Sequence, residues 1–101
     1  MAVTKVIRYR TKPECADENE RLIRGVFAEL AEQKPAGLRY ATFRLADGIS
    51  FLHVAVLDAE ENPLSSSPAF SEFQSAIGDR LDEGPAQSDA TIIGNFGLVS
   101  G

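Results

Sequence analysis

The chain has 101 residues and a formal net charge of −5, with 44% hydrophobic and 25% charged residues. This length supports one domain with a modest core, which we assign to residues 1–101. The acidic balance argues against nucleic-acid binding, because a phosphate backbone calls for a basic face. No apolar run approaches the roughly 20 residues of a membrane-spanning helix, and no signal peptide is recognisable, so no membrane partner is expected. The single cysteine fits a reducing compartment, and we expect a cytoplasmic protein.

The first third of the chain predicts a strand followed by a helix. Residues 3–10 are rich in β-branched and aromatic side chains, which favours a strand. Pro13 suits the first turn of a helix, where its missing N–H costs nothing, and Pro35 and Gly37 are expected to end this helix near Gln33. The apolar stripe of the helix has the expected spacing and consists of Leu22, Ile23, Val26, Phe27 and Leu30.

Residues 38–57 predict a β-hairpin with a tight turn at Asp47-Gly48. A two-residue turn pairs Arg44 with Phe51 and continues outward, so that successive side chains alternate between two faces. The aliphatic face carries Ala41, Phe43, Leu45, Leu52, Val54 and Val56. The mixed face carries Leu38, Tyr40, Thr42, Arg44, Phe51, His53, Ala55 and Leu57. Both faces are too apolar to face water, so both must be covered.

The last part of the chain predicts a second helix and a last strand. Ser67 and Pro68 form a good N-cap and first-turn pair. Gly84-Pro85 is expected to break this helix, and a last strand is expected at about residues 90–99. The apolar stripe of the second helix consists of Phe70, Phe73, Ile77 and Leu81.

The order βαββαβ predicts a ferredoxin-like α+β sandwich. Right-handed crossovers place the first and third strands at the centre of a four-stranded antiparallel sheet, with both helices on one face. The aliphatic hairpin face is then left open. Covering several hundred Å² of it gains on the order of 10 kcal/mol before association costs, so we expect a two-fold homodimer through this face. A monomer that tolerates the patch is the alternative.

Several features of the chain resemble a known superfamily. They are the order of elements, Lys12-Pro13 at the first helix, Leu57-Asp58 at the end of the third strand, and PAFSEF at residues 68–73. Over nearly its whole length the chain resembles the dimeric α+β barrel superfamily, with antibiotic-biosynthesis-monooxygenase-like domains as the closest branch. The superfamily includes cofactor-independent oxygenases of aromatic polyketides, haem-degrading enzymes, small isomerases and chains without an assigned role. The resemblance implies a ligand cavity between helices and sheet, and a dimeric barrel built from the opposite sheet faces.

Haem degradation is not expected. The haem-degrading branch uses an asparagine on the first strand, a tryptophan near the end of the third strand and a histidine in the second helix. Val6, Leu57 and Gln74 stand at these positions here, and the chain has no tryptophan.

His53 is the leading candidate for catalysis, because a histidine can act as a general base near neutral pH. In an oxygenase-like mechanism it would take a phenolic proton while Arg44 stabilises the resulting anion. A core histidine satisfied by Thr42 or a backbone carbonyl is the alternative. Arg8, Tyr9 and Arg10 are interpreted as edge or rim residues. The expected pocket lining consists of Tyr40, Thr42, Phe51, Phe73 and Gln74.

Two functions therefore remain open. The first is a small-molecule enzyme, a cofactor-free monooxygenase acting on a phenolic or quinone-like substrate. The second is a non-catalytic ligand-binding or assembly module of the same fold. The single histidine argues against a metal site, since such sites need several converging ligands. No cofactor is expected.

Overall fold

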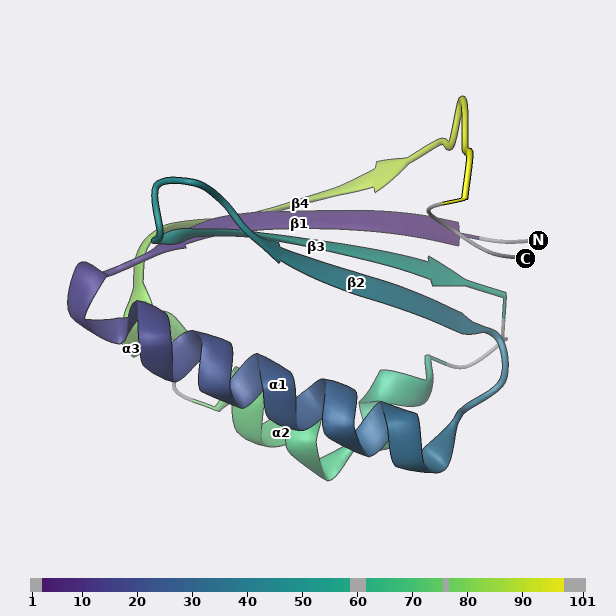
Figure 1. The fold of residues 1–101 in the computed structure, drawn as a ribbon, viewed down its shortest axis with the longest axis horizontal. Coiled ribbons are helices and arrows are strands. Elements are labelled where there is room, and N and C mark those ends of the chain that lie inside the picture. The colour runs from purple at the N-terminus through teal and green to yellow at the C-terminus, as the bar shows by residue number, and fades with distance from the viewer. Residues whose placement is uncertain (1–2, 59–61, 76, 98–101) are drawn as a thin grey trace.

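The computed structural model describes residues 3–58, 62–75 and 77–97. Its four strands form one antiparallel sheet in the order β2-β3-β1-β4, so the first and third strands are central, as predicted. The helices lie together on one face of this sheet (Figure 1), which confirms the ferredoxin-like architecture. The elements are β1 (Val3–Thr11), η1 (Pro13–Cys15), α1 (Ala16–Gln33), β2 (Leu38–Arg44), β3 (Ser50–Leu57), η2 (Pro63–Ser66), α2 (Pro68–Gln74), α3 (Ile77–Arg80) and β4 (Leu81–Ala90). None of the helices described has the length and apolarity needed to cross a membrane.

The predicted start and end of the first helix and the start of the second are confirmed, but the predicted end of the second helix at Gly84-Pro85 is wrong. The helical region divides into α2 and α3 and ends at Arg80, and Gly84-Pro85 lies within β4. A 3-10 turn at Pro13–Cys15 leads into α1, which ends at Gln33, where Lys34 adopts a left-handed conformation with φ of 48°. The Ser67 hydroxyl caps α2 by accepting a hydrogen bond from the backbone N–H of Phe70 at 3.0 Å. The buried face of α1 consists of Ala16, Asn19, Ile23 and Val26.

The hairpin has the predicted register throughout β2 and β3, but the predicted two-residue turn is wrong. Leu45 N–H donates to the Ser50 carbonyl at 2.8 Å, so residues 46–49 form a four-residue connection. Only Gly48 in this loop has a positive φ, of 79°. The Asp47 carboxylate instead accepts from two following backbone N–H groups and from the Ser50 hydroxyl. A longer loop centred on the same residue pair leaves the register unchanged.

The last strand lies earlier in the chain than predicted. β4 spans Leu81–Ala90 and contains Gly84-Pro85, whereas residues 91–97 of the predicted strand 90–99 form no strand, and residues 98 and 99 lie outside the described chain. Beyond Leu81, every residue of β4 is exposed. An exposed edge strand needs no β-branched side chains and tolerates proline and charge, so its sequence carries little strand signal.

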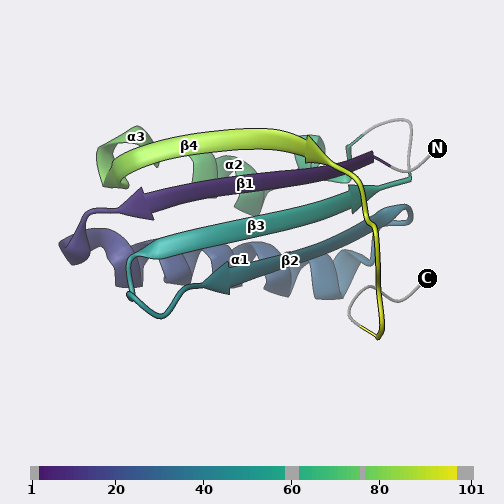
Figure 2. The ribbon, with the colours of Figure 1, turned by 90° about the horizontal axis from the view of Figure 1, so that it is seen from above.

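The face of the sheet opposite the helices is open within the subunit. Figure 2 looks onto this face and shows residues 91–97 crossing it from the end of β4. Phe43 on this face is 39% exposed, and Ile93 and Phe96 of the crossing segment are almost fully exposed. The subunit therefore covers one side of its hairpin and leaves much of the other side accessible.

Gly84 is the position at which we expect the fold to be most sensitive to a single methyl group. Its φ is +96°, and a Cβ there would lie 3.0 Å from the Arg8 carbonyl oxygen and 3.1 Å from Tyr9 Cα. Gly84→Ala is therefore expected to lower the free energy of unfolding by about 2–4 kcal/mol, from left-handed strain and overpacking together. Gly25→Ala is the matched control, because its Cβ meets nothing within 4 Å. It should raise stability by about 0.5–1 kcal/mol in urea unfolding. Equal stabilities of the two variants would contradict this account.

Candidate functional site

A cavity of about 270 Å³ lies between the sheet and the second helical region. Its walls are mostly apolar, with Phe70, Phe73 and Leu64 on the helical side. The strands contribute the polar side chains Lys5, Tyr9, Tyr40, His53 and Gln87. Apolar walls around a few converging polar groups are typical of small-molecule sites, although this volume is at the small end of their range.

His53 lies at the centre of a buried hydrogen-bonded cluster. Its side chain is on β3, and the residue is only 3% exposed. Nε2 lies 2.8 Å from the Tyr9 hydroxyl. Nδ1 lies 2.5 Å from the Tyr40 hydroxyl and 3.1 Å from Thr42 Oγ1. The contact with Thr42 agrees with the alternative prediction, in which His53 is a core histidine that hydrogen-bonds Thr42.

The hydrogen count of this cluster leaves one donor for a ligand. A neutral imidazole and two tyrosine hydroxyls bring three hydrogens to two histidine–tyrosine contacts. Asn19 Nδ2 donates to the Tyr9 oxygen at 2.9 Å and so uses none of them. With the hydrogen of His53 on Nε2, the hydroxyl hydrogen of Tyr9 is left over. With it on Nδ1, the hydroxyl hydrogen of Tyr40 is left over, and Thr42 or a ligand can accept it. Because both tyrosines line the cavity, Tyr9 or Tyr40 can present an O–H group to a bound molecule.

Burial keeps all three groups of this cluster neutral at pH 7. It lowers the pKa of His53 to about 4, since an imidazolium ion would lose its hydration there. Burial also raises the pKa of Tyr9, which the hydrogen bond from Asn19 partly opposes, and raises the pKa of Tyr40. His53 is thus always available as a proton acceptor, but a weak one while the cavity holds no anion.

Asn19 and Arg80 support the cluster from the helical side. Arg80 Nε donates to Asn19 Oδ1 at 3.2 Å, which orients the Asn19 amide toward Tyr9. Arg80 Nη2 and Nη1 donate to the carbonyls of Phe73 and Ser75, at 2.5 and 3.2 Å. The buried guanidinium of Arg80 thereby satisfies two backbone carbonyls at the end of α2 and also orients Asn19, the second hydrogen-bond partner of Tyr9.

Sequence reasoning missed three residues of this cluster. Tyr9 was interpreted as a rim residue but is 4% exposed and contacts His53. Asn19 lies three and four positions before Leu22 and Ile23 of the predicted stripe, so helical spacing could have placed it on the buried face. Arg80 had no such signal, because its position depends on the break between α2 and α3.

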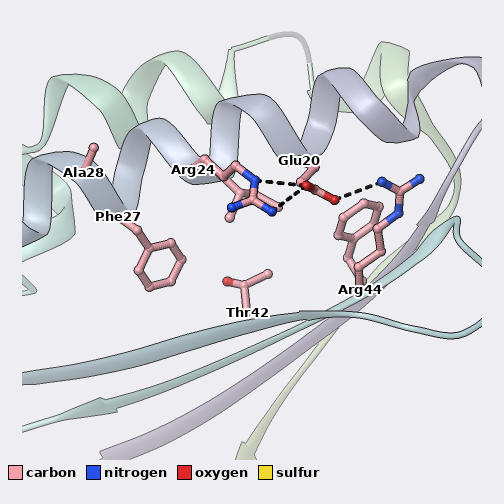
Figure 3. A pocket seen from close by; sticks show the side chains of 8 residues that line it. Glu20, Arg24, Phe27, Ala28, Thr42 and Arg44 are labelled. Carbon is pink, nitrogen blue, oxygen red and sulfur yellow. Dashed lines mark hydrogen bonds and ion pairs between the residues drawn. The ribbon is translucent and has the colours of Figure 1, made fainter.

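The structure divides the predicted site residues between two hollows. His53, Tyr40, Phe73 and Gln74 line the cavity. The others, Arg44, Thr42 and Phe51, line a separate groove between α1 and β2 (Figure 3). The structure therefore does not bring Arg44 to the cavity beside His53. Among the residues described, no group of three or more His, Cys, Asp or Glu side chains is placed to hold a metal ion.

Solved structures share this fold, although no protein-family model and no curated protein matches the sequence. A candidate antibiotic biosynthesis monooxygenase from Bacteroides thetaiotaomicron has a TM-score of 0.76 and 15% identity, over 99% of this chain and 96% of its own. SnoaB, a cofactor-independent oxygenase from Streptomyces nogalater, has a TM-score of 0.67 and 20% identity, over 95% and 97%. Rv0793 from Mycobacterium tuberculosis has a TM-score of 0.67 and 20% identity, over 94% and 98%. The chain has the fold of the antibiotic biosynthesis monooxygenase-like proteins, as its resemblance predicted.

The depressed pKa of His53 predicts a specific pH dependence of stability. An unfolded histidine titrates near 6.5 and the folded one near 4, so between these values the unfolded state binds more protons. The free energy of unfolding should therefore fall by up to about 3 kcal/mol as the pH decreases from about 6.5 to about 4. Urea unfolding across this range measures the effect.

His53→Gln is the matched control, since it keeps every carboxylate of the protein. Its stability should depend less steeply on pH between 5 and 6.5 than that of the wild type, because this range lies between the folded and unfolded pKa values of His53. Identical slopes for the two proteins would show that His53 is not buried in its neutral form.

Proposed function

We propose that the cavity binds a small aromatic molecule and that the protein is a cofactor-independent monooxygenase-like enzyme acting on a phenolic or quinone-like substrate. The observation that carries the proposal is the neutral, buried His53, joined to two tyrosines at a mostly apolar cavity. Such a cavity excludes water from a flat ring while a tyrosine O–H addresses its polar substituent. SnoaB, which shares this fold, is a cofactor-independent oxygenase, and this analogy supports the proposal beside the site itself.

The proposed reaction balances without an added reductant. Conversion of a phenol to a quinone with one O₂ forms one water, and the phenol supplies all four electrons. The proton of the phenol passes to the tyrosine that donates to the unprotonated ring nitrogen of His53, while that tyrosine gives its own hydrogen to His53. The resulting electron-rich phenolate is the species that reacts with O₂.

Energetics allow this step. Moving a proton from a phenol of pKa about 10 to an imidazole of pKa about 4 costs about 8 kcal/mol. That is half of the barrier of about 16 kcal/mol for turnover at about 10 s⁻¹. Burial of the phenolate raises this cost, as it raises the pKa of Tyr9 and Tyr40, and attraction between the phenolate and the imidazolium opposes that increase. Arg44 has no part in this mechanism, because its guanidinium lies in the groove.

A non-catalytic ligand-binding module is the second candidate. Both ring nitrogens of His53 already contact hydroxyl groups, and its low pKa makes it a weak base. These features suit a histidine that shapes the cavity without accepting a proton. The cavity volume of about 270 Å³ supports a bound molecule in either case.

Incubation with a hydroxynaphthalene and O₂ separates the two candidates. An enzyme should form quinone, measured by visible absorbance, with one O₂ consumed per quinone. His53→Gln should then lower kcat by about 10²- to 10⁴-fold and leave ligand binding largely intact. Comparison of Tyr9→Phe with Tyr40→Phe identifies the hydroxyl that faces the substrate. Binding without quinone formation by the wild type would support the ligand-binding module, and absence of binding would refute both candidates.

We further propose that two chains associate through the open sheet face. The exposed Phe43, Ile93 and Phe96 supply apolar area that a second copy would cover. The cytoplasmic location expected from the single cysteine also stays a prediction.

Sedimentation of the dilute protein tests the association. The wild type should sediment at twice the mass of the chain, and Phe43→Asp at the mass of one chain, because a carboxylate would be buried unpaired in the interface. Ala31→Asp adds the same charge on the exposed side of α1 and should leave the dimer intact. A wild-type protein of single-chain mass would end the proposal.

A further inference from the structure

The groove between α1 and β2 is a second hollow, of about 520 Å³, distinct from the cavity at His53. Figure 3 shows Phe27, Thr42 and Arg44 around an open space beneath Arg24 and Glu20. We propose that this groove is a second binding site, for a small aromatic carboxylate, and that Glu20 takes the place of the ligand carboxylate when no ligand is bound.

The first support is the position of the Glu20 carboxylate between two guanidinium groups. Oε1 of Glu20 accepts from Arg44 Nη1 at 2.9 Å. Oε2 lies 2.8 Å from Arg24 Nη2 and 2.9 Å from Arg24 Nε. One arginine comes from the helix and the other from the strand, so the two clamp a single carboxylate. This is the arrangement in which arginine recognises carboxylate ligands.

The second support is that Arg44 is held in place independently of Glu20. Its Nε donates to the Gly48 carbonyl at 2.8 Å, and Nη1 also reaches Asp17 at 3.1 Å. Its guanidinium carbon lies 5.7 Å from the centroid of the Phe51 ring. A guanidinium fixed in this way loses little freedom on binding an anion, which favours affinity.

The third support is the chemistry of the remaining walls. Ile23, Phe27 and Ala28 form an apolar side of the groove beside the arginines. Phe27 is itself stacked on Tyr40, with ring centroids 5.0 Å apart, so its ring is held in a fixed orientation. An apolar wall next to two guanidiniums matches a ligand with a flat hydrophobic body and one carboxylate.

Displacement of Glu20 should be easy. The Glu20 side chain is 32% exposed and that of Arg24 is 77% exposed, and ion pairs so accessible to water contribute little to stability. The charges of Asp17 and Glu20 balance those of Arg24 and Arg44. Glu20→Gln would therefore leave the groove with one uncompensated positive charge.

An NMR titration of the ¹⁵N-labelled protein with benzoate tests the proposal. Benzoate should cause saturable shifts at the amides of Ala28 and Arg44, which line the groove and not the cavity. Neutral benzyl alcohol should bind at least fivefold more weakly. Glu20→Gln should tighten benzoate binding by about fivefold, and Arg24→Gln should weaken it by a similar factor. Arg21→Gln is the matched control, because Arg21 lies on the same helix but pairs with Glu18, and it should leave binding unchanged.

Three outcomes would overturn the proposal. The first is an absence of saturable shifts in the groove. The second is equal binding of benzoate and benzyl alcohol. The third is a Glu20→Gln protein that binds no tighter than the wild type. In the first case, shifts confined to the ring of His53, the single histidine of the chain, would assign benzoate to the cavity. The test thus separates this site from the proposed function.

Discussion

The need to satisfy polar groups on the covered face of the sheet is the constraint that organises this molecule. His53, Tyr9 and Tyr40 are placed there by strand alternation, and the helices then exclude water from them. A buried polar group without a partner costs about 1–3 kcal/mol, so each of these side chains requires a neighbour. Asn19 supplies one from α1, at a position where an apolar residue would fit the stripe. The same network that stabilises the fold therefore also fixes the donors and acceptors of the cavity.

This network also explains why the cavity and the groove on the covered face are separate. Tyr40 lines the cavity and Thr42 lines the groove, and both contact Nδ1 of His53. Together with the Phe27–Tyr40 stack, these contacts build a wall across the covered face. The cavity on one side holds the neutral cluster of His53, Tyr9 and Tyr40, and the groove on the other side holds the ion pairs of Glu20. The two hollows consequently suit different ligands. The cavity suits an aromatic ring with a hydroxyl group, and the groove suits a carboxylate.

Much of the fold could be predicted because it depends on patterns that are local in sequence. The hairpin register and the stripe of α1 follow from alternation and helical spacing, and the strand order follows from the handedness of crossovers. The position of β4 could not be predicted, since an exposed edge strand places few demands on its side chains. The sequence also did not predict that Arg44 lies in the groove while His53 lies at the cavity. Sharing a sheet face does not imply sharing a hollow, because contacts with Asp17 and Glu20 on another element direct this side chain.

The two faces of the hairpin differ in how their burial can be completed. The mixed face is completed inside the subunit, by helices that bring polar partners as well as apolar cover. The aliphatic face requires only apolar area, which any flat hydrophobic surface can supply.

Association through the exposed edge at β4 is disfavoured, because Asp82, Glu83 and Pro85 would have to enter a continuous ladder. Lys5 and Arg10 of β1 also engage acidic side chains of this strand. Charge and proline thereby disfavour pairing of another strand along the β4 edge of the sheet.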